Sequence, residues 1–329
     1  MRVTVLGAGS WGTTVASLVA ARNDTVLWAR DGTVAAEVRE QHTNDRYLPG
    51  FTLPHDLDAT DDLERAVCRA ELLVVGVPSH GFRDVITAAA AHIHPWIPVV
   101  SLTKGLERES LLRMTEVIQD VLPGHPAVAL TGPNLAKEIM SGKAAASVIA
   151  TEDLVVAAAI QRVLQLGLFR LYLNHDVIGC ELGGVLKNVI AIAAGMAEGL
   201  GVGDDTRAAV ITRGLGELTR LGVAMGGEAS TFAGLTGMGD LMATCMSPQS
   251  RNRYVGEQLG KGRALDDVLG EMTMVAEGVP AAVTAAQLAR RHRIHMPICD
   301  DIRRVVTGEI SASDAYSGLG APGHEAEPG

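Results

Sequence analysis

A glycine-rich turn close to the start of the chain constrains the fold more than any other feature. Gly7, Gly9 and Gly12 follow an apolar run at residues 3–6 and precede an apolar stretch at residues 13–21. Between a strand and a helix, such glycines allow the backbone to approach a pyrophosphate, which sits on the N–H groups at the positive end of the helix. Because strand, turn and helix come in the right order, we predict a dinucleotide-binding site rather than an ordinary turn.

Short apolar runs alternate with helical patterns through the first half of the chain. This alternation is typical of a mainly parallel sheet with helices on both faces. Buried strands are expected at residues 3–6, 25–28, 72–75, 99–102, 127–130, 147–150 and 169–172, and helices at 33–41 and 111–121 and from an Asp62 cap to Cys68. The fold class predicted is α/β, with residues 1–180 forming a Rossmann-like, doubly wound NAD(P)-binding domain.

The strand pattern stops near Glu181, and helical periods continue from there. Long helices are expected at residues 181–200 and 205–221, the second with Asp204 as its N-cap. We therefore expect residues 181–317 to form an all-helical substrate-binding and catalytic domain. Residues 318–329 are rich in Gly and Pro and are expected to be a disordered tail.

Charge and cysteine content exclude several classes of protein. The 329 residues carry a net charge of −10, which disfavours nucleic acid and anionic lipid as partners. The four cysteines form no Cys-x-x-Cys pair or Cys/His cluster, so no disulfide framework or metal site is expected and a reducing cytoplasm fits best. Histidines and prolines interrupt the longest uncharged run, between Asp84 and Lys104, so no membrane span is expected. No signal peptide is expected either, because the first predicted strand begins at residue 3 and leads directly into the glycine-rich turn.

Polar residues follow several of the predicted strands, at the edge of the sheet where ligands of such folds bind. Arg30 ends the second strand and favours NADP, because an arginine there can accommodate the 2′-phosphate. The neighbouring Asp31 could still bind the ribose of NAD, so that alternative stays open. Lys104 follows the fourth strand, and Gly132 and Asn134 lie in the turn after the fifth.

In the helical half, Lys187 is a single cation on a helix face of very small residues. Helical spacing places it beside Gly183, Gly184, Ala191 and Ala194. A ligand or another backbone could approach this face closely. The alternative is a tightly packed helix whose lysine extends to water.

A second glycine-rich block follows at residues 234–245 and surrounds Asp240. It leads into Ser250, Arg251 and Asn252, of which the last two offer planar donors suited to phosphate or carboxylate. In an acidic chain, this pair is a candidate anion site.

Taken together, these blocks closely resemble the soluble bacterial NAD(P)-dependent glycerol-3-phosphate dehydrogenases. The matching segments are residues 7–12, 44–50, 77–80, 101–107, 132–138, the helix of Lys187, 203–207 and 237–252. The resemblance implies a Rossmann domain and a helical domain with the site between them. It also implies reversible hydride transfer between NAD(P)H and dihydroxyacetone phosphate, which yields sn-glycerol 3-phosphate for phospholipid synthesis.

The resemblance also assigns roles to individual residues. Lys187 is implied as the catalytic acid/base and a substrate contact. The other implied substrate contacts are Lys104, Gly132, Asn134, Asp240, Ser250, Arg251 and Asn252. The cofactor contacts, from motif and resemblance, are Gly7, Gly9, Ser10, Trp11, Gly12, Arg30, Lys104, Ala136, Arg251, Val275 and Glu277. Asn134 and Asp205 depart from the family, which often has Ser or Thr and Asn at these positions.

Two alternatives remain at this level. A 3-hydroxyacid or 6-phosphogluconate-type dehydrogenase would share the domains and the helix-borne lysine, but not the block at residues 237–252. A non-catalytic nicotinamide-binding sensor would have no need for Lys187, Lys104 and Asp240 together. A phosphorylated small molecule is the expected substrate and no metal is required. The sequence does not determine the oligomeric state, and a homodimer is one alternative.

Overall fold

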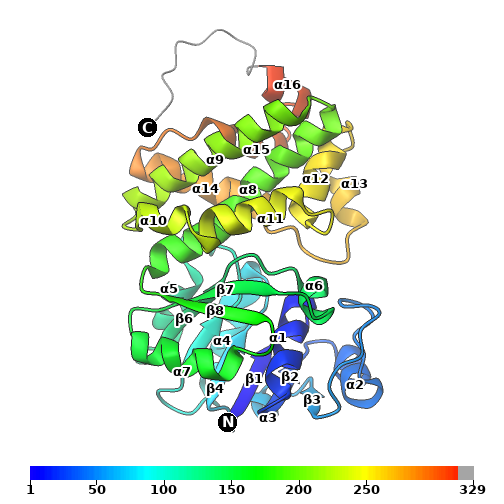
Figure 1. Ribbon diagram of the computed structural model, residues 1–329, viewed down its shortest axis with the longest axis vertical. Helices are drawn as coiled ribbons and strands as arrows, with labels where there is room; N and C mark the ends of the chain where they lie inside the picture. The colour runs from blue at the N-terminus through cyan, green and yellow to red at the C-terminus, as the bar shows by residue number, and fades with distance from the viewer. Residues whose placement is uncertain (318–329) are drawn as a thin grey trace. The chain divides into compact units, whose positions relative to one another are not determined.

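The computed structural model describes residues 1–317, which form two compact units: the first is Met1–Glu181, and the second begins at Leu182 (Figure 1). The boundary falls inside one long helix, α8 (Val177–Leu200). The tail expected at residues 318–329 lies outside the described residues.

The first unit is built on one eight-stranded sheet in the order β3-β2-β1-β4-β5-β6-β7-β8. Neighbouring strands are parallel except for β6 and β7, which are antiparallel. This arrangement confirms the predicted Rossmann-like, mainly parallel sheet. The strands are β1 (Arg2–Leu6), β2 (Asp24–Trp28), β3 (Leu57–Thr60), β4 (Leu72–Val75), β5 (Val99–Ser101), β6 (Ala127–Thr131), β7 (Ala145–Ala150) and β8 (Phe169–Asn174).

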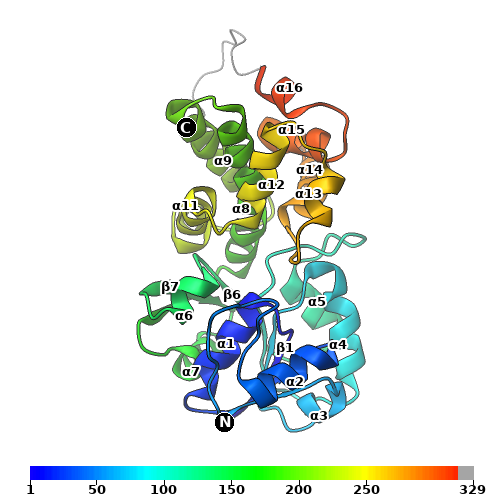
Figure 2. The same ribbon diagram turned by 90° about the vertical axis from the view of Figure 1, so that its right-hand side faces the viewer.

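Helices cover both faces of this sheet (Figure 2). One buried cluster joins the sheet to α1, α2 and α7, with Val15, Val38 and Ile160 among its members. The other joins it to α3, α4 and α5 through side chains such as Phe82 and Ile118. The elements are α1 (Ser10–Ala20), α2 (Gly32–Gln41), α3 (Leu63–Val67), η1 (Ser79–Gly81), α4 (Phe82–Ala90), α5 (Met114–Val121), α6 (Ala136–Met140) and α7 (Leu154–Leu164).

Two local details of the first unit differ from the sequence prediction. Strand β3 was not predicted, because Leu57-Asp58-Ala59-Thr60 has no apolar run and lies at the edge of the sheet. Helix α5 begins at Met114 rather than residue 111. Leu111 has a left-handed backbone (φ 62°), and the Glu116 carboxylate accepts a hydrogen bond from the N–H of the N-cap residue, Arg113.

The described part of the second unit is helical. Its elements are the rest of α8, α9 (Asp204–Ala224), α10 (Ala229–Phe232), the π-helical turn η2 (Leu235–Gly239), α11 (Asp240–Met246), α12 (Arg251–Gly260), α13 (Leu265–Gly270), α14 (Gly278–His292), α15 (Pro297–Val306) and α16 (Ala312–Ser317). The N-cap of α9 is Gly203 (φ 90°), not Asp204 as predicted. Asp204 is instead in the first turn, where its carboxylate accepts a hydrogen bond from Arg207.

Helix α8 is the core helix of this unit. By length and hydropathy it is the one helix in the described part of the chain that could cross a membrane, but 89% of the apolar stretch is buried inside the protein. Its backbone touches that of α12. A Cβ on Gly256 would lie 2.0 Å from the carbonyl oxygen of Ile192, and one on Gly195 would lie 2.0 Å from that of Arg253. This contact fixes α12 against the helix that carries Lys187.

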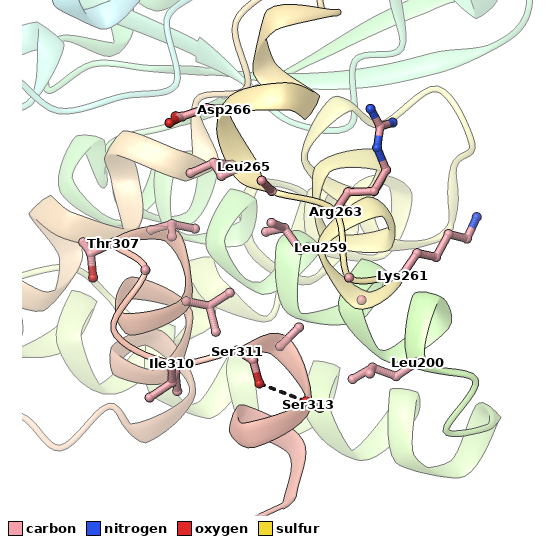
Figure 3. A pocket seen from close by; sticks show the side chains of 17 residues that line it. Leu200, Leu259, Lys261, Arg263, Leu265, Asp266, Thr307, Ile310, Ser311 and Ser313 are labelled. Carbon is pink, nitrogen blue, oxygen red and sulfur yellow. Dashed lines mark hydrogen bonds between the residues drawn. The ribbon is translucent and has the colours of Figure 1, made fainter.

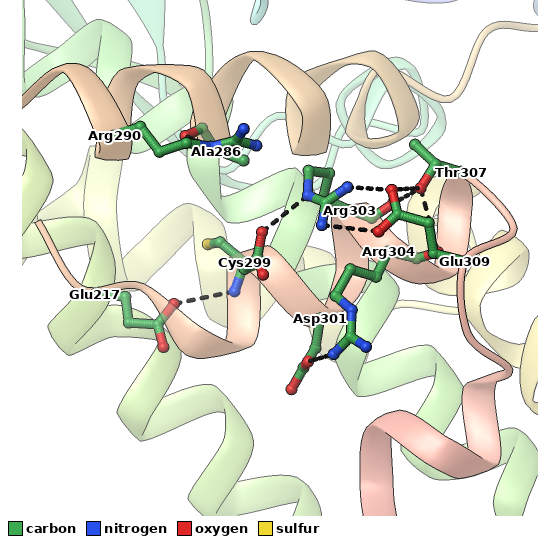
Figure 4. A network of polar contacts seen from close by, with 10 residues as sticks. Glu217, Ala286, Arg290, Cys299, Asp301, Arg303, Arg304, Thr307 and Glu309 are labelled. Atoms are coloured by element: carbon green, nitrogen blue, oxygen red, sulfur yellow. Dashed lines mark hydrogen bonds and ion pairs between the residues drawn. The ribbon is translucent and has the colours of Figure 1, made fainter.

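Each unit also contains a buried glutamate that satisfies the start of a distant helix. In the second unit, the carboxylate of Glu217 on α9 accepts a hydrogen bond from the N–H of Ile298 on α15 at 2.8 Å. It also accepts one from the N–H of Cys299 at 3.0 Å (Figure 4). In the first unit, Glu181 accepts from the N–H of Thr115 on α5 at 3.0 Å and from Arg113 Nη1 at 2.6 Å. Burial raises the pKa of both carboxyl groups.

Candidate active site

The glycine turn lies between β1 and α1, as predicted. Gly7 has φ 109°, and a Cβ on Gly12 would lie 2.0 Å from the carbonyl oxygen of Gly7, so neither position accommodates a larger residue. By contrast, a Cβ on Gly9 would meet no atom within 4 Å. The N–H groups in the first turn of α1 have no partner within the helix. The turn therefore offers backbone donors on an open side.

Trp11 and Ala136 lie at the same end of the first unit. Both are partly buried and pack against the core cluster of the α1 face. The Trp11 ring meets Phe169 edge-on at 6.0 Å. Its indole Nε1 is buried without an acceptor among residues 1–317, which leaves a donor that a ligand could use.

Arg30 and Asp31, which follow β2, differ in how available their side chains are to bind the adenosine ribose. Both carboxylate oxygens of Asp31 are engaged: Oδ1 caps α2 by accepting from the Thr33 N–H at 3.0 Å, and Oδ2 pairs with Arg46 at 2.8 Å. Arg30 is exposed, and no described residue forms a hydrogen bond or an ion pair with it. The guanidinium of Arg30 is therefore the group more available to a ligand.

Three predicted residues meet at the carboxyl ends of β5 and β6. Lys104 Nζ donates to the carbonyl oxygen of Gly132 at 2.7 Å. Asn134 Nδ2 donates to Ser147 Oγ at 3.1 Å, while its Oδ1 is buried and accepts no hydrogen bond from residues 1–317. The structure thus brings an ammonium and an unused acceptor to one edge of the sheet.

In the second unit, Lys187 forms a buried polar cluster with α11. Its Nζ lies 2.8 Å from Asp240 Oδ1 and 2.6 Å from Thr244 Oγ1. The Thr244 hydroxyl in turn donates to the backbone carbonyl of Asp240. All three residues are at most 7% exposed. An ammonium has three hydrogens, and no third acceptor for Lys187 lies among residues 1–317.

The small-residue face of α8 is used for backbone packing. A Cβ on Gly183 would lie 2.8 Å from the carbonyl oxygen of Thr236 in η2. The tightly packed alternative is therefore correct for this glycine. It is wrong for Lys187, whose side chain is buried against Asp240 rather than extended to water.

The predicted anion-binding residues lie at the start of α12. Ser250 is the N-cap, and its Oγ accepts from the N–H of Arg253 at 3.2 Å. The exposed Arg251 donates through Nη1 to the carbonyl oxygen of Val275 at 2.7 Å. Glu277 is the N-cap residue of α14, two positions beyond Val275.

Asn252, the next residue of α12, is buried. Its Nδ2 donates to Asn188 Oδ1 at 2.8 Å, and its Oδ1 accepts from the Gly278 N–H at 2.9 Å. Because Asn188 follows Lys187, these bonds tie the start of α12 to the lysine-bearing turn of α8. One amide hydrogen of Asn252 remains without a partner among the described residues.

Two cavities in the described part of the second unit lie apart from these residues. One, of about 680 Å³, is lined by residues 259–266 and 305–308 together with Leu200, Ile310 and residues 311–313 (Figure 3). Its cations Lys261 and Arg263 are paired with Glu257 and Glu271. The other, of about 560 Å³, lies between the ends of α14 and α15. None of the predicted site residues lines either cavity.

Sequence reasoning did not assign a role to Thr244 or Asn188. Thr244 lies four residues after Asp240, so helical spacing could have placed both on one face of α11. Its contact with Lys187 spans 57 residues and leaves no local signal. Among residues 1–317, no group of three or more His, Cys, Asp or Glu side chains could hold a metal ion.

Two family models together match nearly the whole described chain. The one described as the N-terminus of NAD-dependent glycerol-3-phosphate dehydrogenase matches residues 2–157, and the one for the C-terminus matches residues 176–317.

The chain is also similar to individual proteins of the same name over almost the whole length of both chains. The chain is 57% identical to a Sphingopyxis alaskensis protein named glycerol-3-phosphate dehydrogenase (NAD(P)+) 2, covering 100% of this chain and 99% of the relative. It is 48% identical to glycerol-3-phosphate dehydrogenase (NAD(P)+) 1 of Mycobacterium tuberculosis, with coverages of 98% and 96%. The crystal structure of glycerol-3-phosphate dehydrogenase from Coxiella burnetii is 34% identical, with a TM-score of 0.93 and coverages of 97% and 98%.

Proposed function

The chain belongs to the NAD-dependent glycerol-3-phosphate dehydrogenase family, and from this premise we propose roles for its residues. The protein is an NAD(P)-dependent oxidoreductase that interconverts dihydroxyacetone phosphate and sn-glycerol 3-phosphate. The family predicted from the sequence motifs is confirmed, so the other dehydrogenase classes and the non-catalytic sensor no longer apply. The assignment of residues within this activity is our own.

The first unit fits a dinucleotide cofactor. The backbone beside Gly9 is open to a ligand, and the N–H groups in the first turn of α1 are donors suited to the cofactor phosphates. The indole N–H of Trp11, which has no acceptor among residues 1–317, is a further donor for the cofactor. When bound, NAD(P)H supplies the hydride. We assign Gly7, Gly9, Ser10, Trp11, Gly12 and Ala136 to its binding, together with Lys104, Arg251, Val275 and Glu277.

Lys187 is the proposed acid/base. Hydride addition to a ketone carbon develops negative charge on its oxygen, and a nearby ammonium stabilises that charge and then supplies a proton. The observation that supports this role is that Lys187 is buried and held by Asp240 and Thr244. One hydrogen of its ammonium still has no acceptor among residues 1–317. Asp240 and Thr244 orient the ammonium so that this third hydrogen can meet the substrate oxygen.

The start of α12 is the proposed phosphate site. Helix N-termini attract anions, and the backbone N–H groups of Arg251 and Asn252 lie in the first turn of α12. The exposed guanidinium of Arg251 adds charge-assisted donors. The side chain of Asn252 holds α12 to α8, and Ser250 completes the site as N-cap. Because phosphate is remote from the ketone carbon, its binding orients the substrate for reaction.

The remaining substrate contacts come from the first unit. We assign the Lys104 ammonium and the backbone of Gly132 to the polar end of the substrate. The buried Oδ1 of Asn134 is an acceptor without a partner among residues 1–317, so it suits the substrate hydroxyl.

NADPH is the proposed preferred cofactor. Arg30 is exposed at the ribose-reading position, while Asp31, the residue that would favour NAD, is engaged by Thr33 and Arg46. The formal charge of Arg30, Asp31 and Arg46 together is +1, which suits a 2′-phosphate.

We further propose a cytoplasmic enzyme whose product feeds glycerophospholipid synthesis. All four cysteines are unpaired, as suits a reducing compartment.

A homodimer is the proposed assembly, supported by the edge strand β8, on which Tyr172 is 56% and Leu173 37% exposed. Light scattering of the purified chain tests it, and a monomeric mass at micromolar concentration contradicts it.

One assay tests the proposed phosphate-dependent site. NADPH oxidation is followed with dihydroxyacetone phosphate and with unphosphorylated dihydroxyacetone as the matched control. We expect rapid oxidation with the first and at least about a tenfold lower kcat/KM with the second, because the phosphate contacts are lost. Equal use of the two ketones contradicts the phosphate site.

A further inference from the structure

Asn44 belongs to a segment, residues 44–50, to which the proposed mechanism gives no role. It lies between α2 and β3 and is completely buried (0% exposed). A buried amide carries donors and an acceptor that must all find partners. The partners of Asn44 therefore show what its side chain holds in place.

The side chain of Asn44 is bound to the glycine turn. Its Nδ2 donates to the carbonyl oxygen of Ala8 at 2.9 Å and to Thr13 Oγ1 at 2.8 Å. The Thr13 hydroxyl, which accepts this second bond, itself donates to the same Ala8 carbonyl at 3.2 Å. The Asn44 Oδ1 accepts from the N–H of Tyr47 at 3.3 Å. The Ala8 carbonyl, between Gly7 and Gly9, thus receives two hydrogen bonds from the protein interior.

These bonds fix the direction of the next donor. The peptide unit that joins Ala8 to Gly9 is planar and trans, so its C=O and N–H point in opposite directions. With the Ala8 oxygen turned toward Asn44, the Gly9 N–H points away from it. No acceptor for this N–H lies among residues 1–317, and the side of Gly9 where a Cβ would stand is open to 4 Å.

We propose that Asn44 is a positioning residue that aims the Gly9 N–H at the pyrophosphate of the cofactor. The inference rests on the proposed cofactor site and adds a residue outside the glycine motif. Its ligand group is the pyrophosphate, which NADH and NADPH share. Loss of Asn44 therefore weakens both cofactors by the same factor, whereas loss of Arg30 weakens NADPH selectively.

The test is direct binding of NADH and NADPH to the full chain, measured by calorimetry without turnover. For Asn44→Ala we expect both Kd values to rise at least tenfold and by equal factors, because the Gly9 N–H no longer has a fixed direction. The KM for dihydroxyacetone phosphate, measured at saturating cofactor, is expected to stay within about twofold. A general loss of structure would raise all of these constants together.

Thr25→Val is the matched control in the same unit. Thr25 is also 0% exposed and donates to a backbone carbonyl, that of Asn23, at 3.1 Å. It lies near the amino end of β2, away from the edge that carries the glycine turn. We expect Thr25→Val to lower the Tm while leaving both Kd values unchanged.

Substitutions of Thr13 keep the test decisive if Asn44→Ala does not fold. Thr13→Val removes the hydroxyl, which is the second donor to the Ala8 carbonyl beside the Asn44 amide, and is expected to raise both Kd values equally. Thr13→Ser keeps the hydroxyl and is expected to leave both Kd values near those of the wild type. Unchanged cofactor affinity in Asn44→Ala or Thr13→Val overturns the inference alone. A wild-type chain that binds neither nucleotide overturns the cofactor assignment and the inference with it.

Discussion

The buried ion pair of Lys187 and Asp240 allows catalysis and stability to be separated by a double-mutant cycle. The two side chains are only 7% and 3% exposed, and their charged atoms are 2.8 Å apart. Removal of one member of such a pair leaves a charge in the interior at a cost of about 3–5 kcal/mol. Lys187→Met leaves the carboxylate without this partner, and Asp240→Asn leaves the ammonium without its counter-charge.

The double variant removes both charges. We expect each single variant to lower the free energy of unfolding by about 3–5 kcal/mol, and the double variant to recover at least about 2 kcal/mol, because the two effects are coupled. Activity follows a different pattern. Lys187→Met and the double variant both lack the proton donor, so kcat is expected to fall about 10²–10⁴-fold in each.

Urea unfolding followed by circular dichroism gives the stabilities, and NADPH oxidation with dihydroxyacetone phosphate gives kcat. Lys261→Met is the control, because Lys261 is about half exposed and pairs with Glu257 at the surface of the same unit. Its expected effect on stability is below about 1 kcal/mol. The reasoning fails if Lys187→Met retains more than a tenth of wild-type kcat, or if the two stability losses simply add.

Three further substitutions test separate parts of the molecule. Arg30→Ala is expected to lower kcat/KM for NADPH about tenfold or more and to leave NADH nearly unchanged, and equal losses contradict the assignment. Arg251→Ala is expected to lower kcat/KM for dihydroxyacetone phosphate about tenfold or more but to affect dihydroxyacetone much less; comparable losses for both ketones would argue against a phosphate contact. Burial raises the pKa of Glu217 above its ordinary value of 4.5, so its carboxyl contributes most to stability below pH 4.5 and this contribution is lost as the pH rises through the folded-state pKa. The stability of the wild type minus that of Glu217→Gln is therefore expected to decrease from acid to neutral pH in urea titrations, and an increase would refute the raised pKa.

Local sequence patterns predicted the parts of the fold that depend on neighbouring residues. The glycine turn, the buried strands and the long helices follow from short-range spacing, and the structure has them at or close to the expected positions. The errors occur where local signals are weak or ambiguous. Asp204 is a good N-cap residue by type, but Gly203 adopts the cap position with a left-handed backbone that aspartate does not favour.

The contacts that organise the candidate site join residues far apart in sequence. Thr244 meets Lys187 across 57 residues, and Asn44 meets Ala8 across 36. Likewise, the sequence shows Arg30 and Asp31 side by side, but not that Arg46 and the start of α2 engage Asp31. Such pairings depend on which elements become neighbours, so no periodicity in the chain reveals them.

The position of the unit boundary within α8 limits how this chain can be divided for experiments or recombined with other proteins. A fragment that ends at Glu181 would retain only five residues of the helix, from Val177, which is too short to be stable alone. A fragment that ends before α8 would lack Glu181 and leave Arg113 and the Thr115 N–H without their buried acceptor. A chimaera that takes its first unit from a relative should therefore take both α5 and the start of α8 from that same relative.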